Sequence, residues 1–272
     1  MIINPYIVQL DADHPGFRDE EYRRRRDFIA LESEKYNGSI DSIPTIEYTN
    51  KELETWQYVY SKLIELSPYY AFDEHITGLN ELGITGKEIP QLRYITEIMH
   101  KKTGFQMVPV KGLIPGKEFM QSFAEGFFYS TQYVRHHSTP GFTPEPDIIH
   151  EILGHASGLY SKDVSKIAKE IGSAALKTDD KDKLKKLENI YWFVIEYGLI
   201  KENGKIKTFG AGNLSSFIDI KRCVEEKECH RPFDIEVIAN TSYDPTITQK
   251  ILFVAESFDD CYRQVKDYCN SL

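Results

Sequence analysis

The sequence predicts a mainly α-helical protein with minor β structure, folded as a single domain over residues 1–272. Apolar residues recur at helical spacing in most segments of the chain. No internal repeat, low-complexity tract or linker rich in proline, glycine or serine divides it. A chain of 272 residues can bury a large core, and its 41% hydrophobic and 28% charged residues are typical of globular proteins.

Helices are expected wherever apolar residues recur every three or four positions between charged ones. The predicted helices cover residues 20–35, 51–66, 90–102, 144–153, 162–176, 182–200 and 259–268. The first of them contains four consecutive arginines at 23–26, flanked by acidic residues at 20, 21 and 27. The mixed charge favours a solvated helix face over a basic patch.

Two strands and one turn complete the prediction. Residues 127–136 are rich in aromatic and β-branched side chains, which favour extended backbone, and residues 252–255 form a second, shorter strand. At 202–205 the Asn-Gly pair is suited to a tight turn, because both residue types tolerate left-handed backbone conformations.

Charge and cysteine content restrict the partners and the compartment. A net charge of −9 argues against nucleic acids and anionic membranes as partners, and no apolar run is long enough to span a bilayer. The four cysteines form no C-x-x-C pair, which argues against a thiolate zinc site. Few cysteines, and an N-terminal segment without the pattern of a secretion signal, indicate a cytoplasmic location.

The stretch TPEPDIIHEILGH at 143–155 holds two histidines, His150 and His155, with one residue more between them than in H-E-x-x-H. In an α-helix five residues rotate a side chain by about 140° past a full turn, so the two rings would lie on different faces. They can meet if the helix ends at Gly154, since glycine suits a helix C-terminus. Pro144 and Pro146 stiffen the approach, and Thr143 is a plausible cap.

A third candidate ligand lies in IYWFVIEYGLI at 190–200, where Glu196 is the only charged residue. Helical spacing places it near Trp192 and Phe193, facing the interior. A buried carboxylate without a partner is very costly, so Glu196 must be neutral, paired with a cation such as Arg135, or bound to a metal.

Two histidines and one carboxylate leave several positions on a metal ion open. This set suits non-haem Fe(II) oxygen chemistry. Zinc hydrolases also use two histidines and a glutamate, in which case Glu151 would be the catalytic base. The ligands alone leave both alternatives open.

The chain also resembles the pterin-dependent aromatic amino acid hydroxylases, most of all the single-domain bacterial members that act on phenylalanine. The similar stretches follow the family order over nearly the whole chain. They are LDADHPGFRDEEYRRRR at 10–26, IPQLRYITE at 89–97, TGFQMVPVKGLIPGKEF at 103–119, TQYVRHHSTPGFTPEPDIIHEILGH at 131–155, IYWFVIEYGL at 190–199, FGAGNLSSF at 209–217 and FVAESF at 253–258.

The resemblance implies a monooxygenase that uses Fe(II), O2 and a tetrahydropterin, either tetrahydrobiopterin or a relative, to hydroxylate phenylalanine to tyrosine. It assigns His150, His155 and Glu196 as iron ligands and Arg135 as the group that binds the amino acid's carboxylate, which suits a bidentate guanidinium. Further positions in the substrate pocket would be Thr143, Pro144, Trp192, Tyr197, Gly212 and Ser215.

For the pterin, the resemblance implies contacts from Gly112, Leu113, Phe119, Glu151 and Tyr191, with Phe119 stacked on the flat ring. Asp147 is expected to orient a ligand histidine, or otherwise to be a carboxylate at a helix start. The sequence departs from the family at Pro115-Gly116, where a serine pair is common, and at 155–160, which lacks a proline.

Phenylalanine, tyrosine and tryptophan are all conceivable substrates, and the sequence favours phenylalanine. The resemblance implies that Trp192 is the residue type usual in phenylalanine and tyrosine hydroxylases, whereas tryptophan hydroxylases usually carry phenylalanine there. A hydroxylase of tyrosine or of tryptophan is the alternative. The loop at 242–248 corresponds to a region that distinguishes phenylalanine from tyrosine. No regulatory or tetramerisation domain is expected, which suggests a monomer or a small homo-oligomer. A relative that binds without catalysis is the remaining alternative.

Overall fold

Helices build most of the molecule, a computed structural model that describes residues 6–141 and 143–272. Residues 1–5 and Phe142 lie outside the described residues. Residues 1–5 belong to the N-terminal segment expected to lack a secretion signal. The α-helices are α1 (Glu20–Ser33), α2 (Asn50–Tyr70), α3 (Asp73–Glu81), α4 (Leu92–Thr103), α5 (Gly116–Ser122), α6 (Ile148–His150), α7 (Ser157–Leu159), α8 (Lys162–Leu176), α9 (Lys181–Ile190), α10 (Ala211–Leu214), α11 (Asp219–Glu225), α12 (Ile235–Ala239) and α13 (Phe258–Ser271).

Two small sheets lie among the helices. Strands β1 (Gln106–Pro109) and β2 (Phe127–Ser130) form a parallel pair. A four-stranded sheet has the order β4-β3-β6-β5, in which β3 is antiparallel to β4 and parallel to β6. Its strands are β3 (Leu199–Glu202), β4 (Lys205–Thr208), β5 (His230–Pro232) and β6 (Leu252–Ala255).

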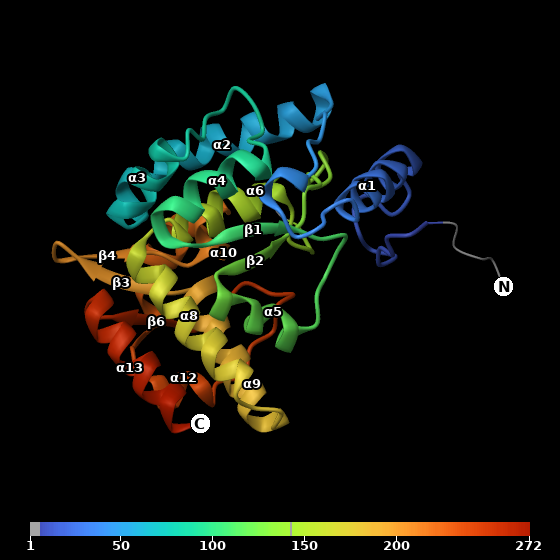
Figure 1. Ribbon diagram of the computed structural model, residues 1–272. Coiled ribbons are helices and arrows are strands. Elements are labelled where there is room, and N and C mark those ends of the chain that lie inside the picture. The colour runs from blue at the N-terminus through green and yellow to red at the C-terminus, as the bar shows by residue number, and fades with distance from the viewer. Residues whose placement is uncertain (1–5, 142) are drawn as a thin grey trace.

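The helices cover the β1/β2 pair from two sides. In Figure 1, α2, α3 and α4 lie on one side of this pair, and α5, α8, α9 and α13 lie on the other. Helix α8 packs against both α5 and α13. The largest fully buried side chains include Trp56, Phe72, Phe105, Phe123, Phe128, Phe193, Phe209 and Phe253. The prediction of a mainly helical protein with minor β structure is confirmed.

Several elements occur where the sequence predicts them. The limits of α8 and β6 agree with the prediction, and α1, α2, α4 and α13 differ from it by a few residues at their ends. The turn between β3 and β4 has positive φ angles at Asn203 (52°) and Gly204 (74°), as expected for a tight hairpin.

Two predicted helices are wrong in part. The helix predicted over 182–200 gives way to β3 at Leu199, because backbone pairing with β4 and β6 overrides the local preference. The helix predicted over 144–153 starts only at Ile148, with Asp147 as its cap in place of Thr143. The residue before a proline avoids helical backbone, which explains why the chain is not helical up to Pro146. The strand predicted over 127–136 ends at Ser130.

The prediction that the four arginines at 23–26 form a solvated helix face is wrong for two of them. Arg23 and Arg26 are buried, and Arg24 is exposed. The guanidinium of Arg26 lies 3.3 Å from the centre of the Tyr133 ring and donates to the Glu145 carboxylate at 2.7 Å. This long-range ion pair and the aromatic face compensate for the burial of the charge.

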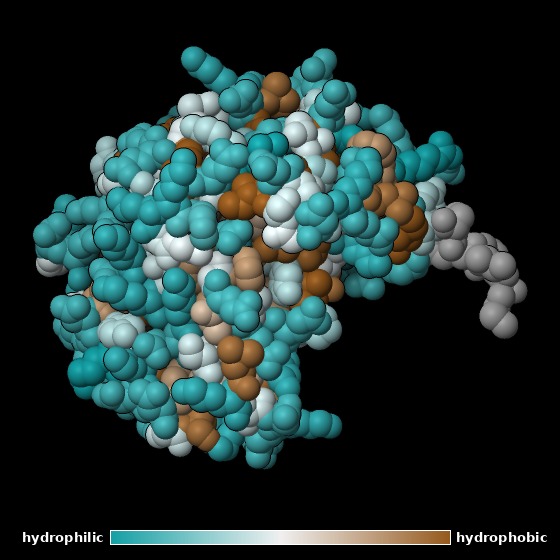
Figure 2. All heavy atoms as spheres, viewed as in Figure 1, coloured by the Kyte–Doolittle hydropathy of each residue, from teal (hydrophilic) through white to brown (hydrophobic). Residues whose placement is uncertain are grey.

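The surface shown in Figure 2 is largely hydrophilic, with apolar residues in small groups. Within residues 6–141 and 143–272, no helix is both long enough and apolar enough to cross a bilayer.

Candidate metal centre between two cavities

Two short π-helical segments carry the three predicted ligands. The first, Glu151–Ala156, joins α6 to α7, so the chain stays helical from Ile148 to Leu159. The second, Tyr191–Glu196, continues α9. A π-helix bonds each N–H to the carbonyl five residues back, as Ser157 N–H does to the Ile152 carbonyl. Residues five apart therefore come to the same side, and His150 and His155 lie close together.

The prediction that the helix ends at Gly154 is therefore wrong. Glycine is required there because a Cβ atom would lie only 2.6 Å from the carbonyl oxygen of Ala211 in α10. The close approach of α10 brings Ser215 next to the first histidine, as described below.

We expect Gly154→Ala to lower the free energy of unfolding by about 1–3 kcal/mol, the usual cost of overpacking, and to weaken metal binding by moving His155. Denaturant unfolding and metal titration measure both effects. Gly158→Ala is the matched control, because its Cβ would meet nothing closer than the Phe209 oxygen at 3.9 Å. Equal behaviour of the two variants would contradict this explanation.

The three donors meet at one point inside the protein. The Nε2 atoms of His150 and His155 are 2.9 Å apart, and Glu196 Oε1 lies 3.0 Å from His155 Nε2. The second carboxylate oxygen of Glu196 lies 3.7 Å from His150 Nε2. Adjacent ligands held at about 2.1 Å and at right angles around an ion are about 3 Å apart, so these spacings fit a single metal ion.

The protonation states of His150 and Glu196 suit a metal. Burial lowers the pKa of His150 to about 4, so its ring is neutral and keeps a lone pair at neutral pH. Burial raises the pKa of Glu196, but the adjacent imidazole of His155 has the opposite effect and the resulting pKa is about 2. Glu196 pairs with the two histidines and not with Arg135, which was its alternative partner.

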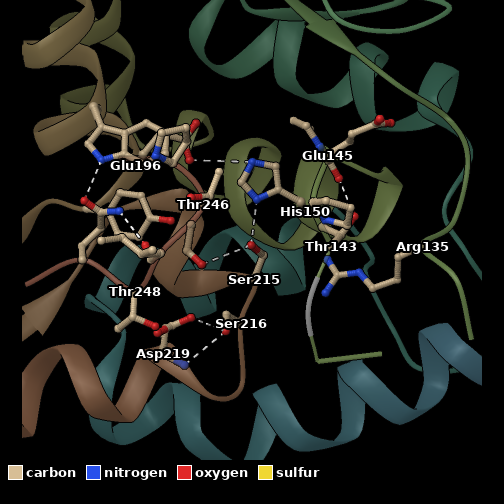
Figure 3. Close-up of a pocket in the computed structure, with 18 of the residues that line it drawn as sticks. Arg135, Thr143, Glu145, His150, Glu196, Ser215, Ser216, Asp219, Thr246 and Thr248 are labelled. Atoms are coloured by element: carbon tan, nitrogen blue, oxygen red, sulfur yellow. Dashed lines mark hydrogen bonds and ion pairs between the residues drawn. The ribbon is translucent and has the colours of Figure 1, made fainter. Parts of the chain in front are cut away.

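Hydrogen bonds hold two of the donors in place. Ser215 Oγ lies 2.8 Å from His150 Nδ1 (Figure 3), and the Tyr191 hydroxyl donates to Glu196 Oε1 at 2.5 Å. Tyr191 and Glu196 are also five residues apart in a π-helix. Such partners fix the orientation of a ligand and are a regular part of metal sites. Ser215, expected from the resemblance to line the substrate pocket, thus also supports a ligand.

Ser215→Ala is predicted to weaken metal binding by roughly tenfold, because His150 loses the hydroxyl that orients its ring. The dissociation constant for Fe(II) or Co(II) measures this loss. Ser216→Ala is a suitable control, since the hydroxyl of Ser216 donates to Asp219. Unchanged affinity in Ser215→Ala would show that the hydroxyl does not position the ligand.

Asp147 does not contact either imidazole. Its carboxylate caps α6 by accepting from the backbone N–H of His150 at 3.1 Å, so the alternative of a helix-start carboxylate is correct. Both of its oxygens also accept from the Arg135 guanidinium, at 2.7 and 3.1 Å. Asp147 and Arg135 form an almost fully buried ion pair.

A cavity of about 500 Å³ opens on one side of the three donors. All seven residues expected for the substrate pocket line it, namely Arg135, Thr143, Pro144, Trp192, Tyr197, Gly212 and Ser215. Sequence reasoning missed Glu145, Asp219 and Gln249 in its wall. The spacing of four residues from Ser215 to Asp219 was a weak signal that Asp219 lines the same cavity. No local sequence feature marks Gln249 as a residue of the cavity wall.

The loop predicted to affect substrate choice packs on Trp192. The Tyr243 ring stacks on the indole at 4.2 Å with an angle of 8° between the planes, and the indole N–H donates to Gln249 Oε1 at 3.2 Å. Residues 245–249 line the larger cavity. The loop therefore holds Trp192 in position and contributes to the cavity wall itself.

A smaller cavity of about 200 Å³ lies on another side of the donors. The five residues expected for the pterin all line it, namely Gly112, Leu113, Phe119, Glu151 and Tyr191. Phe119 packs edge-on against Tyr191 at 5.5 Å. The Glu151 carboxylate accepts from the Thr131 N–H at 3.2 Å, and burial raises the pKa of this carboxyl.

The departure from the family after His155 has a local consequence. Ser157 stands in the segment that lacks the proline, and its hydroxyl donates to the Leu153 carbonyl at 2.6 Å and lies 2.9 Å from Nδ1 of the buried His75. The hydroxyl thus satisfies a carbonyl of the π-helical segment. The Pro115-Gly116 pair lies at the start of α5 and lines neither cavity.

Comparison with known proteins identifies the class. The family model described as biopterin-dependent aromatic amino acid hydroxylase matches residues 1–272. The chain belongs to this family.

Two curated relatives show how far the similarity extends. The chain is 38% identical over 275 residues to tyrosine 3-monooxygenase of Homo sapiens, covering 100% of this chain and 52% of the relative. It is 39% identical over 271 residues to phenylalanine-4-hydroxylase of Caenorhabditis elegans, covering 98% and 59%. The chain spans about half the length of the curated relatives it matches.

Among solved structures, the phenylalanine hydroxylase of Chromobacterium violaceum with bound iron(III) and 7,8-dihydrobiopterin has a TM-score of 0.80 and 26% identity, covering 91% of this chain and 90% of that one. The phenylalanine hydroxylase of Legionella pneumophila has a TM-score of 0.77 and 29% identity, covering 84% and 93%.

Proposed function

We propose that this protein is a non-haem iron, tetrahydropterin-dependent monooxygenase that hydroxylates phenylalanine to tyrosine with O2. One observation carries the proposal. His150 and Glu196 line both cavities, together with Leu113, Pro146 and Trp192. A site of this form can place two different organic molecules next to one metal ion, which is what a hydroxylase with a reducing cofactor requires.

His150, His155 and Glu196 would hold Fe(II), which together with a tetrahydropterin supplies the reduction of O2. Since His150 and Glu196 line both cavities, a molecule in either cavity would lie next to an ion held by these donors. Ser215 and Tyr191 hold His150 and Glu196 in place. The residues of the chain therefore act by positioning the donors and both organic molecules.

Arg135 would bind the carboxylate of the amino acid. The Nε–H of Arg135 and one N–H of its Nη2 donate to the Asp147 carboxylate. One N–H of Nη1 donates to the Pro140 carbonyl at 3.2 Å. Further N–H groups on Nη1 and Nη2 remain available to a ligand in the larger cavity. Because Asp147 also caps α6, one carboxylate couples the proposed substrate anchor to the helix that carries His150.

The smaller cavity would hold the pterin. Its aromatic wall of Phe119, Phe128 and Tyr191 suits a flat heterocycle, and Glu151 and Thr131 provide polar groups. A Cβ atom added at Gly112 would meet no protein atom within 4 Å, so a ring could approach the backbone on this side.

The two solved structures described above are phenylalanine hydroxylases, whereas several of the similar curated proteins are tyrosine 3-monooxygenases. Pro146, Trp192 and the Tyr197 ring give the larger cavity apolar walls near His150, which favours an unsubstituted ring. An apolar pocket rejects an added hydroxyl only weakly. We therefore infer phenylalanine as the preferred substrate and expect slower oxidation of tyrosine.

The test is anaerobic loading of the full chain with Fe(II), followed by a tetrahydropterin, O2 and each of phenylalanine, tyrosine and tryptophan in turn. Tyrosine formation from phenylalanine that depends on both iron and pterin supports the proposal. Dihydroxyphenylalanine as the faster product would instead indicate a tyrosine hydroxylase. Zinc-dependent hydrolysis without pterin oxidation would support the zinc hydrolase alternative, and iron binding without any product would reject catalysis.

A further inference from the structure

A second cluster of metal-binding side chains lies outside both cavities. Asp19, His136 and His137 place one ligand atom each within 4.8 Å of one another. Asp19 precedes α1, and the two histidines follow Arg135 in the chain. None of the three lines either cavity, so the cluster is separate from the centre at His150, His155 and Glu196.

Asp19 has one oxygen available for a second partner. Its Oδ1 caps α1 by accepting from the Tyr22 N–H at 2.9 Å, whereas Oδ2 lies 3.3 Å from His136 Nε2. A cation bound at Oδ2 would therefore leave the helix cap intact.

His136 is held in the manner of a ligand. Its ring is largely buried, packs edge-on against Tyr22 at 5.0 Å, and has Nδ1 2.7 Å from Ser138 Oγ. The Ser138 backbone N–H also donates to Nδ1, at 3.3 Å. A cation between Nε2 and Asp19 would select the other tautomer, in which Nδ1–H donates to the Ser138 hydroxyl and Nε2 presents its lone pair toward Asp19. Without a cation, Nε2–H can donate to Asp19 instead.

His137 completes the cluster from the solvent side. Its ring is exposed and lies 4.3 Å from the His136 ring. Lys51 places a positive charge near His137, which opposes the binding of a cation. The Glu21 carboxylate lies 3.8 Å from the Lys51 ammonium and partly neutralises this charge.

We propose that Asp19, His136 and His137 bind a divalent transition-metal ion of the Zn²⁺ type, with water in the open positions. Two imidazoles and one carboxylate are a regular donor set for zinc. The ion would join the start of α1 to the segment that follows Arg135, two parts of the chain that are 117 residues apart. Since α1 packs at the edge of the molecule (Figure 1), such a link would stabilise its attachment.

The test is zinc binding to the chelator-treated full chain, with bound metal counted after equilibrium dialysis. His137→Ala, an exposed substitution that leaves the packing intact, should bind one zinc fewer than the wild type, or bind that zinc at least tenfold more weakly. Asp19→Asn should lose the same ion, because asparagine keeps the cap but not the charge. His100→Ala removes another exposed histidine on α4 and should bind as the wild type does.

Glu196→Ala separates this site from the first one. Zinc should still raise the melting temperature of Glu196→Ala but not that of Glu196→Ala/His137→Ala. Equal zinc content in the wild type and His137→Ala would overturn the proposal, and so would an equal loss in His100→Ala. Failure of the proposed hydroxylase activity would leave these results unaffected.

Discussion

Glu196→Ala is expected to lose most of the tightly bound iron and nearly all of the proposed hydroxylase activity. The carboxylate lies 3.0 Å from His155 Nε2 and 3.7 Å from His150 Nε2, and its removal would leave only two histidines to hold the ion. Losing a partner of a metal ligand already costs about 10–100-fold, so losing a ligand should cost more than about 100-fold in metal affinity.

Metal analysis after dialysis and the rate of tyrosine formation measure this effect. The matched control is Glu65→Ala, which removes an exposed carboxylate from α2. Circular dichroism shows whether the variant folds, which matters because Tyr191 also loses its hydrogen-bond acceptor. Full activity or full iron content in Glu196→Ala would remove the basis of the proposed centre.

Arg135→Lys is predicted to weaken amino acid binding by roughly ten- to a hundredfold while changing iron affinity little. Lysine keeps a positive charge beside Asp147 but cannot form the bidentate contact of a guanidinium. A hydrogen bond between charged groups contributes about 1.5–3 kcal/mol, which gives the expected range. The KM for phenylalanine and the dissociation constant for iron, measured on the same preparation, decide the question.

Arg135→Ala should give a different result, because it leaves Asp147 buried without its cation. Breaking a buried ion pair costs about 3–5 kcal/mol, so this variant should also unfold at a lower temperature and bind iron less well. Arg24→Ala, which removes an exposed arginine, is the control. Equal losses of amino acid and iron binding in Arg135→Lys would mean that Arg135 is purely structural.

The sequence determined a large part of this protein. Helical periodicity located α8 and most of the other long helices, and Asn-Gly located the hairpin between β3 and β4. The single charge in an apolar segment marked Glu196 as a candidate ligand, and the spacing of the two histidines raised the question of how they meet. These signals are local, because they depend on residue type and on backbone preference within a few positions.

Only the tertiary structure decided how the site is assembled. The π-helical turns bring residues five apart together, and α10 packs so closely that position 154 must be glycine. Arg135 pairs with Asp147, Arg26 with Glu145, and His150 with Ser215, over separations of 12, 119 and 65 residues. Such contacts depend on where distant segments meet in space, and no preference of the local backbone encodes that.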